Sequence, residues 1–308
     1  LRAGEFDEKM LQANINNFKL YELQSMESNE GRADIFVNSF INGTNWEDEV
    51  TAIDRMAKLT KEDIVAFADK YLKEDNYAVV YKKQGKDPNE KKMTKPEITP
   101  IVSNRDVASP FLTSIQENAV KPIEPVFLDF KKDMSQLTAK SDIPVLYKQN
   151  TTNDLFQLIY VFDMGNNNDK ALGTAFDYLE YLGTSDMTPE ELKSEFYRLA
   201  CTFYVSPGNE RTYVVLSGLN ENMPAAMQLF EKLLADAQVN KEAYNNLVGD
   251  ILKARADAKL NQGQNFSRLM NYAMYGPKSP ATNLLTEAEL ASMNPQELVD
   301  RIHNQNNY

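Results

Sequence analysis

Apolar positions recur at helical spacing along residues 1–83, and an alternating apolar pattern closes that region. Ile64, Phe67 and Ala68 show the spacing well, because residues three or four apart share one face of a helix. The pattern predicts helices followed by one mostly apolar strand, at 5–24, 30–41, 46–57, 61–73 and, for the strand, 76–83. Since a lone strand cannot pair its backbone groups, we expect its partner strands in sequence upstream of residue 1.

Residues 84–125 differ from the region before them in composition. Proline is absent from residues 1–83, whereas six of the thirteen prolines fall between 84 and 125. Six lysines between Lys82 and Lys95 are typical of a solvated, charged connector. We therefore predict a Pro- and Lys-rich linker at 84–125. Within it, Ser109 followed by Pro110 predicts the N-cap and first turn of one short helix.

From residue 126 onward, short runs bounded by turn residues predict strands, and longer periodic stretches predict helices. The predicted strands lie at 126–130, 136–140, 143–148, 156–163, 201–206 and 211–218. The predicted helices lie at 169–182, 189–200, 223–237, 241–259, 263–275 and 295–304. Strands grouped apart from helices favour an α+β fold, with an antiparallel-rich mixed sheet that carries its helices on one face.

A short repeat supports a division into domains. Leu59–Val65 and Met293–Val299 share an apolar residue, a capping residue, an acidic residue and two aliphatic residues in the same order. Repeated units at this scale indicate duplication of a whole fold. We therefore predict that 1–83 is the C-terminal part of one domain and that 126–308 is a related domain lacking its last strand.

Composition narrows the possible functions. A chain of 308 residues with 42% apolar residues has enough material for more than one packed unit. Its net charge of -12 repels phosphate and anionic lipid, so we expect no nucleic-acid partner. No apolar run approaches the roughly 20 residues of a membrane span. One cysteine permits no internal disulfide, and the sequence leaves the cellular compartment open.

The chain has one histidine and one cysteine, which limits metal and nucleophile chemistry. Several His or Cys ligands are needed for a self-contained zinc site, so such a site is excluded by counting. Cys201 opens a predicted strand and is interpreted as a small buried hydrophobic residue. His303 lies among polar residues of the last predicted helix and is interpreted as a surface residue.

Several motifs between residues 145 and 220 resemble a known family. They are Val145-Leu146-Tyr147, Phe162-Asp163-Met164-Gly165, Asp177-Tyr178-Leu179-Glu180-Tyr181-Leu182-Gly183-Thr184 and Pro189-Glu190-Glu191-Leu192. They look like the insulinase or pitrilysin family of zinc metallopeptidases, which includes the mitochondrial processing peptidases. The stretch 30–82 resembles the end of that family's second domain. The resemblance implies duplicated α+β domains, arranged in two halves that close around a peptide, with this chain centred on the inactive third domain.

In the active half of that family a helix carries the zinc motif H-x-x-E-H, in which two histidines hold zinc and the glutamate activates water. One alignment places Asp177, Glu180 and Tyr181 at these positions, and another places Thr174, Asp177 and Tyr178 there. Neither contains a histidine. We therefore predict that these degenerate positions do not bind zinc and that no catalytic residue lies in this chain. Asp177 and Glu180 remain candidates for contacts with a bound peptide.

The resemblance implies a non-catalytic region of a pitrilysin-like endopeptidase, which walls a substrate chamber opposite a zinc-bearing half. Zinc would belong to that catalytic half, in the same polypeptide or on a partner subunit, and this chain would need no cofactor. The expected partner is a peptide or unfolded polypeptide. One alternative is a non-enzymatic assembly protein of the same fold, and another is a free-standing peptide-binding module. An intact H-x-x-E-H upstream in the same gene, or in a neighbouring gene, would favour the peptidase.

Overall fold

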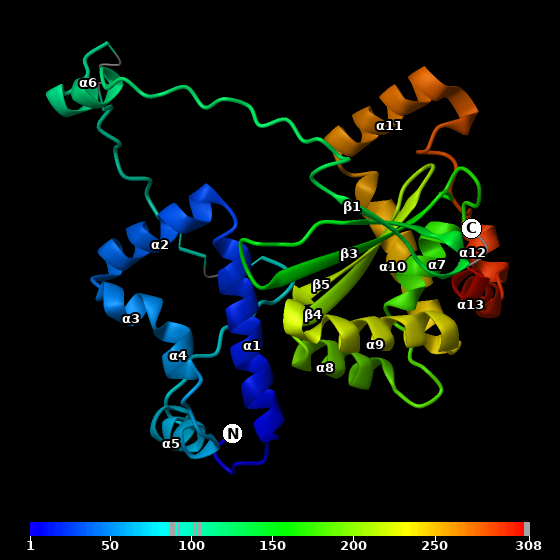
Figure 1. The fold of residues 1–308 in the computed structure, drawn as a ribbon, viewed down its shortest axis with the longest axis horizontal. Helices are drawn as coiled ribbons and strands as arrows, with labels where there is room; N and C mark the ends of the chain where they lie inside the picture. The colour runs from blue at the N-terminus through cyan, green and yellow to red at the C-terminus, as the bar shows by residue number, and fades with distance from the viewer. Residues whose placement is uncertain (87–89, 92, 102, 104–105, 305–308) are drawn as a thin grey trace. The chain divides into compact units, whose positions relative to one another are not determined.

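The computed structural model describes residues 1–86, 90–91, 93–101, 103 and 106–304 (Figure 1). The chain divides into two compact units. Unit 1 combines residues 1–73 with 150–308, and unit 2 comprises residues 74–149. Both contain helices and antiparallel strands, so the predicted α+β class is confirmed.

The first helices of unit 1 begin at side-chain caps. They are α1 (Glu8–Ser25), α2 (Asn29–Asn42) and α5 (Lys61–Tyr71). The Thr60 hydroxyl accepts a hydrogen bond from the Asp63 backbone N–H, while the Asp63 carboxylate accepts one from the Thr60 N–H. This reciprocal capping satisfies donors that the first turn of a helix leaves unpaired.

The single helix predicted at 46–57 is wrong, because the structure divides it into α3 (Trp46–Val50) and α4 (Ala52–Met56). The break lies at Thr51, whose backbone has φ -105° and ψ 10°. The Thr51 hydroxyl donates to the Glu47 carbonyl at 2.6 Å, so the side chain competes for a carbonyl of the preceding turn.

Two predicted strands, 76–83 and 126–130, are also wrong. Both segments belong to unit 2 and neither is a strand. Their apolar side chains are exposed, among them Val80 and Phe127. Apolar composition alone does not make a strand, since a strand requires a neighbour for its backbone groups. Neither segment has such a neighbour among the residues that the structure describes.

In its described residues, unit 2 has one α-helix and one hairpin. Helix α6 (Pro110–Gln116) begins at Ser109, whose hydroxyl accepts a hydrogen bond from the Leu112 N–H at 3.2 Å. Strands β1 (Ser135–Thr138) and β2 (Pro144–Tyr147) pair antiparallel and are joined by the short 3-10 turn η1 (Lys140–Asp142). The helix start and both strands agree with the sequence-based predictions.

The sheet of unit 1 has three antiparallel strands in the order β3-β5-β4. They are β3 (Leu155–Phe162), β4 (Cys201–Pro207) and β5 (Thr212–Leu219), all near their predicted positions. Leu216 on the central strand lies opposite Leu158 on one side and Phe203 on the other. This register places three apolar side chains together on one face of the sheet.

Seven further α-helices follow or separate these strands in the described residues. They are α7 (Leu172–Leu179), α8 (Pro189–Arg198), α9 (Met223–Asp236), α10 (Lys241–Ala258), α11 (Gln262–Tyr275), α12 (Glu287–Ser292) and α13 (Pro295–His303). Helix α7 is shorter than the predicted 169–182. The N–H groups of Tyr181 and Leu182 donate to carbonyls three residues back, so the predicted last turn is not α-helical. Helix α12 was not predicted.

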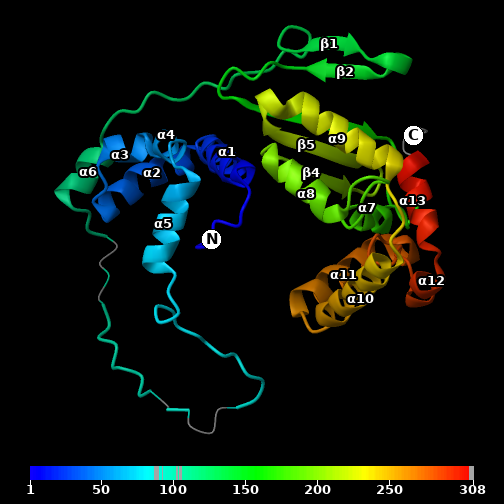
Figure 2. The ribbon, with the colours of Figure 1, turned by 90° about the horizontal axis from the view of Figure 1, so that it is seen from below.

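The core of unit 1 lies between one face of the sheet and its helices. Figure 2 shows α9 along β5 and α8 along β4, and α7 also contacts β4. Alternate residues of the strands, such as Leu158, Phe203 and Leu216, point into this layer. Because a strand presents every second side chain to one face, this arrangement buries one side of the sheet.

Helix α1 packs against α8 and against one end of the same sheet. Its Leu20 is buried with Leu155, Ala200 and Leu219. The Asn17 side-chain amide donates to the Tyr197 carbonyl of α8 at 2.7 Å. These contacts anchor α1 within unit 1. The assignment of residues 1–83 to a preceding peptidase-like domain, with a linker at 84–125 and a further domain at 126–308, stays a prediction.

Candidate functional site

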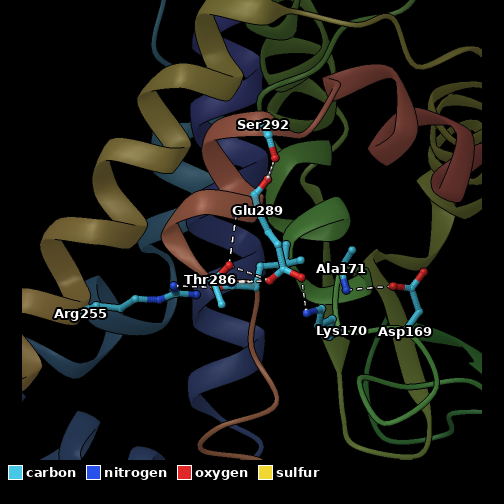
Figure 3. A network of polar contacts seen from close by, with 8 residues as sticks. Asp169, Lys170, Ala171, Arg255, Thr286, Glu289 and Ser292 are labelled. Carbon is cyan, nitrogen blue, oxygen red and sulfur yellow. Dashed lines mark hydrogen bonds and ion pairs between the residues drawn. The ribbon is translucent and has the colours of Figure 1, made fainter.

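Helix α7 and the residues directly after it carry the motif positions named in the sequence analysis. Two ion pairs hold the start of this helix, and Figure 3 shows the one between Lys170 and Glu289. Asp169 accepts a hydrogen bond from the Ala171 N–H at 2.9 Å and pairs with Arg301 of α13 at 2.7 Å. Lys170 pairs with Glu289 of α12 at 2.5 Å. Residues more than 100 positions apart in the sequence therefore fix where α7 begins.

Glu289 links the start of α12 to the residue before the N-cap of α7. Its carboxylate accepts hydrogen bonds from the N–H and hydroxyl of Thr286, which completes the capping box of α12. The hydrogen bond from Lys170 and those from Thr286 lower the pKa of Glu289 to about 2. In the same region, the Arg255 guanidinium of α10 donates to the Leu285 carbonyl at 2.7 Å. The network in Figure 3 thus connects α7, α10 and α12.

One face of α7 fills the core of unit 1. Leu172, Ala175, Phe176 and Leu179 are almost completely buried, as their helical spacing predicts. The helix therefore has no freedom to rotate without exposing this stripe, and its polar residues keep a defined orientation.

The opposite face of α7 presents the two candidate peptide contacts. Asp177 and Glu180 are exposed, Tyr181 is 42% exposed and Thr174 is half-buried. Partial burial of the carboxyl group and, second, the charge of Glu180 raise the pKa of Asp177. The Lys193 ammonium of α8 lies over the Tyr181 ring, 5.7 Å from its centroid.

 The contact between Lys193 and the Tyr181 ring therefore joins α8 to the turn that follows α7 on this exposed side.

Tyr178 differs from the other motif positions because it is fully buried. Its hydroxyl donates to the Asn240 carbonyl at 2.6 Å and accepts from the Asn240 N–H at 2.8 Å. Its ring meets Tyr244 edge-on, with 5.8 Å between centroids. The structure therefore brings Asp177, Glu180 and Tyr181 to the exposed side and separates Tyr178 from them. Its buried role was not apparent from the sequence.

Replacing Tyr178 with phenylalanine should lower the free energy of unfolding by about 1–2 kcal/mol. The ring remains, but the N–H and carbonyl of Asn240 lose their hydrogen-bond partner in a partly buried environment. Urea unfolding followed by circular dichroism would measure the change. Tyr181→Phe is the matched control, since that ring lies on the exposed side of the same helix. Equal losses in both variants would contradict a structural role specific to Tyr178.

Replacing Asp177 with asparagine should stabilise the chain at pH 7, by less than about 1 kcal/mol because water screens an exposed carboxylate. The pKa of Asp177 is raised above its ordinary 3.8, so the folded state binds the proton more tightly than the unfolded state. Stability therefore falls as the pH rises from 3.8 through the raised pKa. Unfolding curves at pH 7 and pH 3 would test this, since the gain should disappear at pH 3. A gain of equal size at both values would contradict it.

The remaining candidates for reactive chemistry do not form a site with α7. Cys201 is buried, and burial raises the pKa of its thiol to about 11, so it stays protonated at neutral pH. His303 is exposed at the end of α13. In the described part of the chain, no three His, Cys, Asp or Glu side chains are grouped closely enough to hold a metal ion. The helices found among these residues include none that is long and apolar enough to cross a membrane.

Sequence reasoning missed the polar network at the start of α7. The spacing of Thr286 and Glu289 is a capping-box signal that predicts α12 once it is noticed. The pairs Lys170 with Glu289 and Asp169 with Arg301 leave no local signal, because their partners are distant in the sequence.

Comparison with known proteins gives structural similarity without a sequence match. No model of a protein family and no curated protein matches the sequence. Among solved structures, the chain is similar to the inactive domain of an M16 peptidase from Pseudomonas fluorescens, with 14% identity and a TM-score of 0.48 over 56% of this chain and 43% of that one. It is also similar to the periplasmic protease PqqL from Escherichia coli, with 14% identity and a TM-score of 0.49 over 97% of this chain and 36% of that one.

A third similar structure is the ferredoxin protease FusC in complex with Arabidopsis ferredoxin, with 10% identity and a TM-score of 0.49 over 90% of this chain and 33% of that one. The chain spans less than half the length of each of these three proteins. Identities of 10–14% and TM-scores below 0.5 do not by themselves assign a function.

Proposed function

We propose that this chain is a non-catalytic region of a pitrilysin-like zinc endopeptidase. In this proposal it forms part of the wall of a chamber that holds an unfolded polypeptide opposite a zinc-bearing half. The observation that carries the proposal is the segment of α7, which resembles the family's metal-binding helix, has no histidine at the positions of the zinc motif and exposes the carboxylates of Asp177 and Glu180.

The chemistry of α7 supports peptide contact better than metal catalysis. Asp177 and Glu180 are exposed on one helix, and an isolated pair of carboxylates suits hard cations better than tetrahedral zinc. The same carboxylates can accept hydrogen bonds from peptide N–H groups or pair with a cationic side chain. Because the buried stripe and the ion pairs of Asp169 and Lys170 hold α7, these acceptors are presented on a rigid element.

Three measurements on the purified chain test this proposal. They are its zinc content, its cleavage of peptides and its binding of an unfolded polypeptide. The polypeptide probe is reduced, carbamidomethylated ribonuclease A, which is soluble and unfolded, and binding is followed by fluorescence anisotropy. We expect saturable binding without cleavage and without stoichiometric zinc. The double variant Asp177→Asn, Glu180→Gln should bind this basic polypeptide more weakly, and the loss should shrink as salt screens the charges.

Two results would contradict the proposal. Stoichiometric zinc together with cleavage by the purified chain would show that it is catalytic. The absence of any binding to the unfolded polypeptide would contradict a role in a substrate chamber. The matched control for the double variant is Asp250→Asn, Glu242→Gln, which removes two carboxylates from exposed positions of α10.

A further inference from the structure

The three-stranded sheet of unit 1 has a second face, which the helices α7, α8 and α9 do not cover. Since side chains alternate along a strand, the residues between the core positions point to this side. We call it the outer sheet face. It consists of Gln157, Ile159 and Val161 of β3, Thr202, Tyr204 and Ser206 of β4, and Tyr213, Val215 and Ser217 of β5.

None of these nine side chains is charged, although 25% of the chain's residues are. At that frequency about two charged residues would be expected among nine. Solvent-facing sides of antiparallel sheets ordinarily carry polar and charged residues. Here Ile159, Val215 and Tyr204 lie directly opposite one another across the three strands. The outer sheet face is therefore neutral in a strongly acidic protein, and its centre consists of aliphatic and tyrosine side chains.

The apolar side chains on the two outer strands of this face are open to solvent. Ile159 is 47% exposed, Val161 53% and Tyr204 49%. Large apolar side chains grouped at a surface are typical of a binding site, and tyrosine is common at interfaces because its hydroxyl can still find a partner. Val215 is buried between its neighbours, which makes the centre of the patch continuous.

One end of the same face already binds an apolar segment. Leu155 and Leu219 continue the outer sheet face along β3 and β5, and they are buried by Leu20 of α1. The face therefore accepts apolar side chains where α1 covers it. The open part is the continuation of that contact.

The area of the outer sheet face that α1 leaves uncovered indicates whether a second copy of the chain or a short peptide fits on it. Three strands about 4.8 Å apart and about six residues at 3.3 Å each give roughly 14 Å by 20 Å, or about 300 Å². A stable interface between two proteins buries about 800 Å² on each partner. The patch is therefore too small to hold a second copy of the chain. Its length corresponds to about six residues of extended peptide.

We propose that the outer sheet face binds a short, extended, uncharged and apolar segment of an unfolded polypeptide. This rests on the proposed function and adds a preference to it, because burying a charged side chain against neutral apolar residues would cost desolvation without an ionic partner. The side chains of Ile159, Tyr204 and Tyr213 make the principal contacts.

The test uses the purified chain and two fluorescein-labelled peptides of ten residues. One contains only Leu, Val, Ser and Gln, and the other has lysine and glutamate in place of the aliphatic residues. We expect the neutral peptide to bind more tightly than the charged one. The double variant Ile159→Lys, Tyr204→Lys should weaken neutral-peptide binding at least tenfold. Gln228→Lys, on an exposed position of α9, is the control and should bind as the unchanged chain does.

Circular dichroism of the double variant checks that it remains folded, which is expected because both positions are exposed. Unchanged neutral-peptide binding in the folded double variant would overturn this inference, while continued binding of unfolded ribonuclease A would leave the proposed function in place. If the chain bound no unfolded polypeptide at all, both would fail. A dimer of the unchanged chain that the double variant abolishes, seen by light scattering, would identify a second copy as the occupant and overturn the inference.

Discussion

Replacing Phe230 with alanine should lower the free energy of unfolding by about 3–5 kcal/mol, the usual loss for a large aromatic residue in a core. Phe230 of α9 is completely buried. Its ring lies 4.8 Å from that of Phe203 and 6.2 Å from that of Tyr160, measured between centroids. The change removes contacts between α9 and two strands and leaves a cavity that close packing cannot easily fill. Urea unfolding followed by circular dichroism measures the loss.

Phe266→Ala provides the matched control for this experiment. Phe266 lies on α11 and is 63% exposed, so its removal should change the free energy of unfolding by no more than about 0.5 kcal/mol. If both variants lost the same amount, the ring of Phe230 would not lie in the core.

Replacing Gly218 with alanine should cost about 3 kcal/mol, from backbone strain and overpacking together. Gly218 lies in β5 with a φ of 156°, a backbone conformation that residues with a side chain rarely adopt. An added Cβ would lie 2.4 Å from the Ala200 carbonyl oxygen and 2.7 Å from the Cys201 Cα. Because these are backbone atoms, the pairing of β4 with β5 would have to shift. The measurement is again the change in urea unfolding.

Gly249→Ala is the same substitution at a permissive site and should have the opposite sign. Gly249 lies inside α10, and nothing lies within 4 Å of where its Cβ would be. Alanine stabilises an exposed helix interior by up to about 1 kcal/mol relative to glycine. A loss in the Gly218 variant no larger than about 0.5 kcal/mol would show that the close approach of β4 and β5 is not rigid.

Local signals predicted most helix and strand positions in this chain. Ser109 caps a helix where the sequence predicts it, and Thr60 and Thr188 cap helices through equally local contacts, because a capping side chain and its backbone partner are only two or three residues apart. Periodicity likewise identified the buried stripe of α7. Such features depend on neighbours in the sequence, so they can be read without knowing the fold.

The failures have a common physical origin. The segments 76–83 and 126–130 have the composition of strands, but pairing depends on a neighbour that the local sequence does not specify. Thr51 interrupts a helix that periodicity made continuous, because its hydroxyl competes for the Glu47 carbonyl. In each case an interaction outside the periodic pattern decided the outcome.

At the candidate site, too, some features follow from the sequence and others only from the structure. The absence of histidine at Thr174, Asp177, Tyr178, Glu180 and Tyr181 follows from the sequence alone, and with it the prediction that this helix does not carry the metal. Only the structure shows that Tyr178 is buried against Asn240 while Asp177 and Glu180 face solvent. The difference arises because a helical position's burial depends on which elements pack around it.

The sequence by itself determined the α+β class, the capped helix starts, the neutral and apolar character of alternate strand positions, and the lack of imidazoles in the motif of α7. The tertiary structure decided which alternate positions of β3, β4 and β5 face helices and which remain open. It also decided that Asp169 and Lys170 would meet Arg301 and Glu289. Composition and period are properties of neighbouring residues, whereas burial and ion pairing require segments distant in the chain to come together.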